Sequence, residues 1–255
     1  MDSTKSRSYW KDLVIPYGRQ DIHQSDIDAV VEVLKSDFLT QGPAVPLFEK
    51  KLTNLTHASY AVAVNSATSA LHIACIALGV KPGDNVWTTP ISFVASANCA
   101  LYCGASIDFV DIDISTYCLS VEKLEVKLQE SAKNGRLPKV LIPVHMAGIS
   151  CDMKRIHELS QKYRFKIIED ASHAIGGHYK GRPVGCCKYS DITVFSFHPV
   201  KIVTTGEGGA VLTNDSKLAK KMSLLRSHGI TKDSDDMTCA SDGSWYYQQI
   251  MLGFN

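Results

Sequence analysis

The chain has 255 residues, is 45% hydrophobic and 21% charged, and is long enough to bury a substantial core as one large domain, or as one domain and part of another. Its 27 lysines and arginines nearly balance its 26 aspartates and glutamates, and the net charge of +1 supplies no basic field of the kind that binds nucleic acid or an anionic membrane. We therefore expect no nucleic acid and no membrane among its partners, and we look for function in individual sites.

The N-terminal sequence MDSTKSRSYWKDLVIP has no continuous apolar core and no small-residue cleavage site, so it does not resemble a signal peptide. The eight cysteines follow no regular framework, and most lie in apolar segments where a thiol packs as a small hydrophobe. These two features predict a cytoplasmic protein with reduced thiols. The longest uncharged run, residues 86–107, contains several polar residues, which favours a buried strand and helix over a membrane span.

Residues 1–57 are predicted to form an N-terminal arm with helices that packs on the main domain. Ser25 followed by Asp28 is similar to a capping box, and apolar residues follow at helical spacing between positions 27 and 34. These signals predict a helix that begins at Ser25.

Short apolar runs rich in Val and Ile then recur, and each is typical of a strand buried on both faces. They occupy residues 60–64, 85–89, 106–111, 140–144, 166–169, 191–197 and 210–213. Helical patterns lie between them. The alternation predicts an α/β domain over residues 58–230, with a mainly parallel sheet, helices on both faces and ligands at the carboxyl ends of the strands. The polar segment 231–255 is predicted to be the start of an incomplete C-terminal region.

Lys201 lies in the stretch SFHPVKIVTTGEGG, between an apolar strand and a glycine-rich loop. A lysine can form a Schiff base with a carbonyl compound, and pyridoxal phosphate needs such a lysine, a carboxylate beside its pyridine nitrogen and a cradle for its phosphate. Asp170 in FKIIEDASHAIG directly follows an apolar strand, where a buried acid is costly unless it meets a cation. A protonated pyridine nitrogen would be that cation.

The phosphate candidate is VAVNSATSALH, in which a strand ends and residues 66–68 open a helix. The free backbone N–H groups and the positive dipole end of a helix attract an anion, and Thr68 adds a hydroxyl. Each feature alone has an ordinary reading, because a Ser/Thr turn or an aspartate is usually only a helix cap and a lone lysine is usually solvated. The presence of all three favours a cofactor site.

Two other kinds of site fit the sequence less well. The histidines at 145, 173, 178 and 198 lack partners at metal-ligand spacing, and Cys186 and Cys187 are adjacent, so we expect no metal site. The TTGEGG loop lacks the Gly-Lys-Ser/Thr of a Walker motif, which disfavours a nucleoside triphosphatase.

The segments NSATSALH, EDASHAIG and SFHPVKIVTTGEGGAV resemble the signature segments of the DegT/DnrJ/EryC1/StrS family, pyridoxal-phosphate sugar aminotransferases of fold type I. The resemblance extends from IPYGRQ to LGFN. It implies the three-layer large domain of that fold, with a mainly parallel seven-stranded sheet, and it implies that the smaller C-terminal domain of longer family members is missing here. PYGRQ, FLTQGP and TTPISFVASANCALYCGA are most similar to the transaminase subfamily of pseudaminic acid biosynthesis.

The resemblance also implies roles for individual residues. It makes Lys201 the Schiff-base lysine and Asp170 the partner of the pyridine nitrogen, with Phe93 stacked on the cofactor ring and His173 near the ring hydroxyl. An aromatic residue at such a helix start is more often simply core. The glycines of TTGEGG would let the backbone pass close beside the lysine bond.

For the cofactor phosphate, the resemblance implies Ala67, Thr68 and Ser196 as ligands, and it makes Asn255 a ligand of the neighbouring subunit's phosphate in a homodimer. The implied reaction moves an amino group from glutamate to a nucleotide-linked 4-keto-6-deoxy sugar, a UDP-sugar in the pseudaminic-acid type of pathway. The alternatives are an aminotransferase for another keto sugar or a keto-cyclitol, and a truncated, non-catalytic module that retains the fold.

Overall fold

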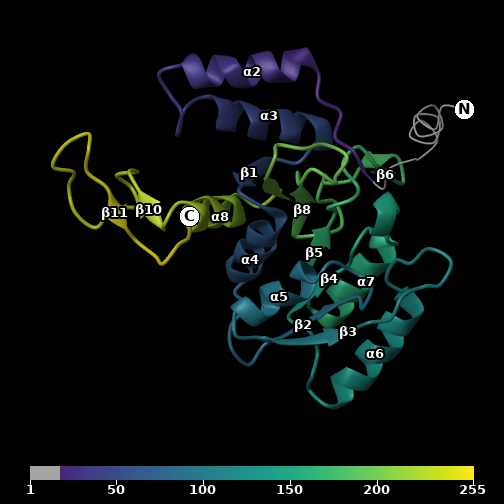
Figure 1. Cartoon of the computed structure of the whole chain (residues 1–255). Coiled ribbons are helices and arrows are strands. Elements are labelled where there is room, and N and C mark those ends of the chain that lie inside the picture. Colours follow the sequence, from purple (N-terminus) through teal and green to yellow (C-terminus); the bar gives the residue numbers. More distant parts are fainter. Residues whose placement is uncertain (1–17) are drawn as a thin grey trace, which may run out of the picture.

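The computed structural model describes residues 18–255, and its centre is a seven-stranded sheet (Figure 1). The strand order is β1-β9-β8-β5-β4-β2-β3. The bounds are Tyr60–Val64 for β1, Asn85–Thr88 for β2, Ser106–Phe109 for β3, Val140–Ile142 for β4, Lys166–Asp170 for β5, Ile192–Ser196 for β8 and Gly209–Thr213 for β9. Only β9 runs antiparallel to its neighbours in this sheet. The expected mainly parallel α/β sheet is therefore confirmed.

Helices cover both faces of the sheet and complete three layers (Figure 1). One face carries α4 (Ala67–Ala77), α5 (Ala95–Tyr102) and α8 (Ser216–Arg226), and the other carries α6 (Val121–Lys133) and α7 (Met153–Tyr163). Successive strand residues point to opposite faces, so Ile168 of β5 packs in the first core and Ile167 in the second. The same alternation sends Asp170 toward α4 and α5 and Glu169 toward α7.

Two helices precede the sheet, α2 (Gln24–Lys35) and α3 (Ala44–Thr56), and Figure 1 shows α2 lying over α3. The predicted cap at Ser25 is wrong. The cap is His23, whose N–H donates to Asp26 Oδ2 at 2.8 Å, because the aspartate three residues on can reach back. Helix α3 buries Leu52, whereas α2 buries no residue. Residues 1–17 of the predicted arm lie outside the described residues.

Several short elements were not anticipated. They are the hairpin of β6 (His178–Tyr179) and β7 (Arg182–Pro183), the pair β10 (Ile230–Thr231) and β11 (Gln248–Gln249), and the 3-10 turn η1 (Met146–Gly148). The uncharged run at 86–107 forms β2, α5 and the start of β3, and in the described part of the chain no helix has the length and apolarity that crossing a membrane requires.

The last described residues are tied to α8. Phe254 N–H donates to Leu225 O at 2.7 Å, His228 N–H donates to Phe254 O at 2.8 Å, and the rings of Phe254 and His72 lie 4.8 Å apart. The backbone up to Phe254 is therefore held, which is inconsistent with a frayed polar tail in this segment.

Candidate active site

A cavity of about 700 Å³ opens at the carboxyl ends of the parallel strands. The fold brings together there every predicted site residue except Asn255: Ala67, Thr68, Phe93, Asp170, His173, Ser196 and Lys201. Asn255 lines a neighbouring cavity, and its backbone oxygen accepts a hydrogen bond from Asn65 Nδ2 at 3.3 Å. Asn65 lines both cavities, so the two cavities are adjacent, and Asn255 does not line the cavity that contains Lys201.

Asp170 is the last residue of β5, and its carboxylate is held from both sides. Ser96 Oγ donates to Oδ2 at 2.6 Å, while the hydroxyl and the N–H of Ser172 donate to Oδ1 at 2.6 and 3.2 Å. Its side chain is buried, with 5% exposure, and within residues 18–255 it forms no ion pair. A buried carboxylate with only neutral donors still favours a cation, and the cavity in front of it has room for one.

Lys201 lies in the loop after β8, half-buried at the cavity wall. Burial lowers the pKa of its ammonium group below the ordinary value of 10.5, and the negative charge of Asp170 partly opposes this shift. A lowered pKa increases the fraction of neutral amine, which is the nucleophilic form.

His173 lines the cavity, and a backbone contact defines its tautomer. The N–H of Ala147 donates to its Nδ1 at 3.3 Å, so the proton of the neutral ring lies on Nε2. Burial lowers the pKa of His173, the positive charge of Lys201 lowers it further, and Asp170 opposes both effects. The neutral ring therefore offers an N–H donor to a ligand.

The helix end expected to hold a phosphate forms as predicted. Ser66 caps α4 and accepts from Ser69 N at 3.1 Å, and within the described residues the N–H groups of Ala67 and Thr68 meet no acceptor. A Cβ on Gly209, the first residue of β9, would lie 2.5 Å from the carbonyl carbon of Ser66. Gly209 therefore allows β9 to pack closely against this helix end. From the sequence, we expected the glycines of this loop to pass close to Lys201 instead.

Phe93 is 71% exposed in the turn before α5, so it is not a core residue and its ring is available to cover a ligand. Ser196 ends β8, is buried, and lines the same cavity. Both residues line the cavity that contains Asp170 and Lys201.

Sequence reasoning missed the residues that fix Asp170 and His173. Ser172 follows Asp170 by two positions, which is an Asx-turn spacing that local inspection can find. Ser96 and Ala147 have no such signal, because they lie 74 and 26 positions from their partners.

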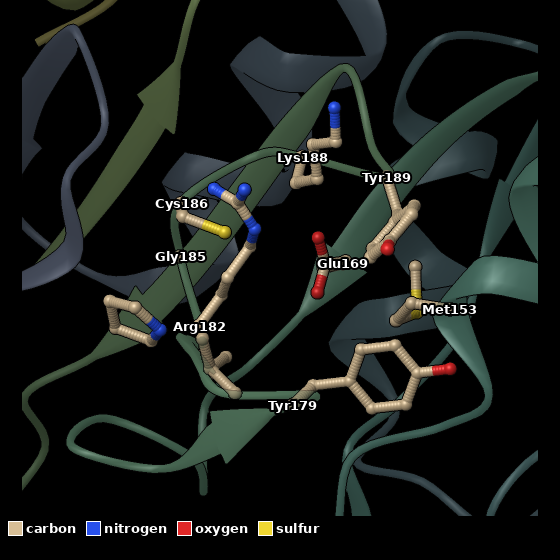
Figure 2. Close-up of a pocket in the computed structure, with 10 residues that line it drawn as sticks. Met153, Glu169, Tyr179, Arg182, Gly185, Cys186, Lys188 and Tyr189 are labelled. Atoms are coloured by element: carbon tan, nitrogen blue, oxygen red, sulfur yellow. The ribbon is translucent and has the colours of Figure 1, made fainter.

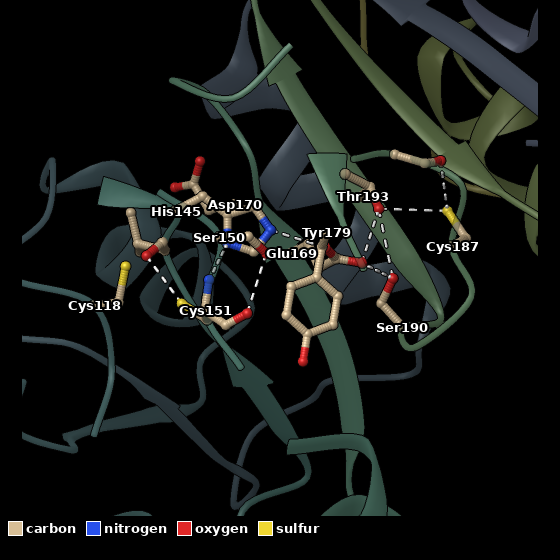
Figure 3. A network of polar contacts seen from close by, with 12 residues as sticks. Cys118, His145, Ser150, Cys151, Glu169, Asp170, Tyr179, Cys187, Ser190 and Thr193 are labelled. Atoms are coloured by element: carbon tan, nitrogen blue, oxygen red, sulfur yellow. Dashed lines mark hydrogen bonds and ion pairs between the residues drawn. The ribbon is translucent and has the colours of Figure 1, made fainter. Parts of the chain in front are cut away.

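His145 meets Glu169 at 2.8 Å on the other face of the sheet (Figure 3). Within residues 18–255, no three His, Cys, Asp or Glu side chains are grouped as a metal site would require. A much smaller cavity lies against Glu169, between Met153 and the 179–189 segment (Figure 2). Its volume of about 20 Å³ has room for water and none for a cofactor.

Comparison with known proteins gives relatives along most of the chain. A Campylobacter jejuni protein named UDP-4-amino-4,6-dideoxy-N-acetyl-beta-L-altrosamine transaminase is 43% identical over 242 residues, which are 95% of this chain and 60% of that protein. The structure of Helicobacter pylori PseC, an aminotransferase involved in the biosynthesis of pseudoaminic acid, is similar with a TM-score of 0.84 and 35% identity, over 94% of this chain and 60% of that one.

The structure of NtdA from Bacillus subtilis, which contains the cofactor PMP, is similar with a TM-score of 0.71 and 33% identity, over 82% of this chain and 46% of that one. The chain thus spans about 60% of the length of the curated relatives it matches. Residues 20–255 match the sequence model of one family over almost the whole chain. The chain belongs to the DegT/DnrJ/EryC1/StrS aminotransferase family.

Proposed function

We propose that this protein is a pyridoxal-phosphate-dependent aminotransferase that moves an amino group from glutamate to a nucleotide-linked 4-keto-6-deoxy sugar. The observation that carries the proposal is the convergence of Lys201, Asp170 and the open end of α4 on one cavity. A nucleophilic amine, a buried carboxylate and an anion-binding helix end are the groups that pyridoxal phosphate requires. Family membership and the PMP in NtdA support the choice of cofactor.

The proposal gives the residues that line the cavity the following roles. The phosphate would be held by the free N–H groups of Ala67 and Thr68, the Thr68 hydroxyl and Ser196. Asp170 would hold the pyridine nitrogen, and the Nε2–H of His173 would face the ring hydroxyl. Phe93, which is exposed beside the cavity, would stack on the ring.

The residues of this chain divide the chemistry between them. When bound, the cofactor supplies a carbonyl carbon for the amine of the substrate and a ring that withdraws electrons from the reacting carbon. Asp170, held by Ser96 and Ser172, would keep the ring nitrogen protonated. Lys201 would hold the cofactor through its Nζ, and the same Nζ would take the α-proton of glutamate as a neutral amine and give it back as an ammonium group. Its lowered pKa suits both roles.

We assign the acceptor to the UDP-linked sugars of a pseudaminic-acid type of pathway. The support is the name of the Campylobacter jejuni relative and the similarity to PseC. This assignment requires that the keto group at C4 of the sugar receives the amino group.

A homodimer with shared sites is part of the proposal. On α2, Ile27, Val30 and Leu34 are 48%, 60% and 64% exposed, an apolar stripe that a second copy could cover. Asn255, which lies outside the cavity of its own chain, would bind the cofactor phosphate of the partner.

We also propose a domain organisation and a cellular location for this protein. We take residues 58–230 as the cofactor-binding large domain, with residues 1–57 packed on it, and residues 231–255 as a separate C-terminal region. A cytoplasmic location is supported by the cysteines within residues 18–255, which are all free thiols and mostly buried.

Two spectroscopic steps test the function. Glutamate should bleach the near-visible absorbance of the protein loaded with pyridoxal phosphate, and a keto sugar should then restore it. A panel of UDP- and dTDP-linked 4-keto sugars and a keto-cyclitol identifies the acceptor. Absence of bleaching by glutamate would instead favour the non-catalytic module, and restoration only by the cyclitol would overturn the sugar assignment.

A further inference from the structure

A polar cluster is buried behind Asp170, on the face of the sheet opposite the cavity (Figure 3). His145 is fully buried, and its Nε2 lies 2.8 Å from Glu169 Oε2. The other carboxylate oxygen of Glu169 accepts the hydroxyl of Ser190 and that of Thr193, the latter at 3.3 Å. A buried polar pair of this kind is weak evidence of stabilisation, because well-packed apolar residues of similar volume are often as stable. Stability alone therefore does not explain the cluster, and we looked for a role in function.

The hydrogen bonds define the state of His145. Cys151 N–H donates to its Nδ1 at 3.3 Å, so Nδ1 carries no proton and Nε2–H donates to Glu169. The imidazole is thus fixed at both nitrogens and has one orientation.

The same residue holds the backbone of Asp170. His145 N–H donates to Asp170 O, and Asp170 N–H donates to Pro143 O, each at 3.0 Å. Because Glu169 and Asp170 are consecutive on β5 and point to opposite faces, His145 restrains the end of this strand twice, through its own N–H and through its ring. A shift or twist at the end of β5 would have to break both contacts.

His145 also begins the turn that orients His173. Within η1, Ala147 adopts φ 51°, and its N–H donates to His173 Nδ1. A Cβ on Gly148, which has φ +88°, would lie 3.0 Å from His173 O, so the turn packs closely against the 173 backbone. The turn at 145–148 therefore contacts both Asp170 and His173.

We propose that His145, paired with Glu169, is a positioning residue for the amino-transfer site, which fixes Asp170 and His173 from behind the sheet. This inference rests on the proposed function. Neither side chain lines the 700 Å³ cavity, so neither acts on the substrate directly. Small displacements of reacting groups are costly, and a misplacement of about 1 Å can reduce a rate by about 100-fold.

The decisive variant is the double substitution His145→Leu with Glu169→Leu, which removes the polar pair and leaves no unpaired buried charge. The substitution leaves the N–H of Cys151 and the hydroxyls of Ser190 and Thr193 without these acceptors, so we expect a lower melting temperature. Measured well below that temperature, kcat for the glutamate half-reaction should fall by at least about 10-fold with little change in KM. Glu169→Gln, which keeps an acceptor for His145, should retain most of kcat. Tyr189→Phe, beside Glu169 in the small cavity, is the matched control and should change nothing.

A second measurement is independent of cofactor and turnover. In the apoprotein, NMR titration of His173 in the double variant should give a raised pKa, because loss of the Ala147 contact removes a hydrogen bond that favours the neutral ring. A normal kcat together with an unchanged His173 titration would overturn the positioning role. If the double variant does not fold, His145→Gln is read in the same two assays. Failure of the unchanged protein to react with glutamate would refute the proposed function instead, while the apoprotein titration would still test the contact.

Discussion

Ser96 Oγ donates to Asp170 Oδ2 at 2.6 Å, joining the first turns of α5 to the end of β5 across 74 positions of the sequence. Ser92 extends the contact, since its hydroxyl lies 2.7 Å from that of Ser96. With Ser172 on the other oxygen, the carboxylate is held before any ligand arrives. Such preorganised electrostatics, with no reorganisation cost during the reaction, is what a site that stabilises a charged ring requires.

Asp170→Asn should cost much more in rate than in cofactor binding. The amide can still form hydrogen bonds but does not favour a protonated pyridine nitrogen, so we expect the glutamate half-reaction to slow by at least about 100-fold. Stopped-flow absorbance and equilibrium dialysis of pyridoxal phosphate measure the two effects. Near-normal half-reaction rates would mean that Asp170 is only structural.

The pKa of His173 should shift in opposite directions in two variants. Its pKa should lie below 6.5 in the apoprotein, so the ring is neutral at pH 7 and becomes protonated only as the pH falls through that lowered value. Lys201→Gln removes a positive charge and should raise the pKa, whereas Asp170→Asn removes a negative charge and should lower it. NMR titration of the ring protons checks both, and shifts of the same sign would contradict the geometry.

Gly209→Ala tests the contact between β9 and the α4 helix end. The new Cβ would lie 2.5 Å from Ser66 C and 2.6 Å from Ala67 N, so backbone must move. We expect a loss of about 1–3 kcal/mol in the free energy of unfolding, with weaker retention of pyridoxal phosphate. Gly18→Ala is the matched control, because its nearest neighbour is Val200 O at 3.7 Å. Equal stability of the two variants in urea titrations would refute the close approach.

Asn255→Ala should weaken cofactor retention while the dimer stays intact, because a phosphate of about two negative charges needs more donors than one helix end supplies. Sedimentation and dialysis separate the two properties. The substitution leaves the backbone oxygen that Asn65 contacts, so the fold of this segment should persist. Unchanged retention would remove Asn255 from the partner's site.

The fold and most of the cavity were predictable because their signals are local. Asp170 ends an apolar strand, Lys201 and the α4 helix end each follow one, and parallel strands bring their carboxyl ends to one edge. Apolar runs likewise predicted all seven strands of the sheet, including β9. The composition of β9 did not indicate its antiparallel direction.

The residues that hold Asp170 and His173 in place were not predictable, because their signals are not local. Ser96 lies in a helix that reads as ordinary core, and Ala147 contributes only its backbone N–H. Glu169 and Asp170 are neighbours in the sequence. Because side chains alternate along β5, Asp170 faces the cavity and Glu169 faces His145. Such contacts depend on tertiary placement, which local patterns do not encode.

The measurement that tests the central claim most directly is borohydride reduction of the protein loaded with pyridoxal phosphate, followed by peptide mapping. We predict label on Lys201 alone, since burial in the cavity lowers its pKa and favours the reactive amine. Lys201→Ala should lose the label and all turnover, while Thr68, Ser196 and Asp170 still hold the cofactor non-covalently. Label on any other lysine, or turnover by the alanine variant, would contradict the account.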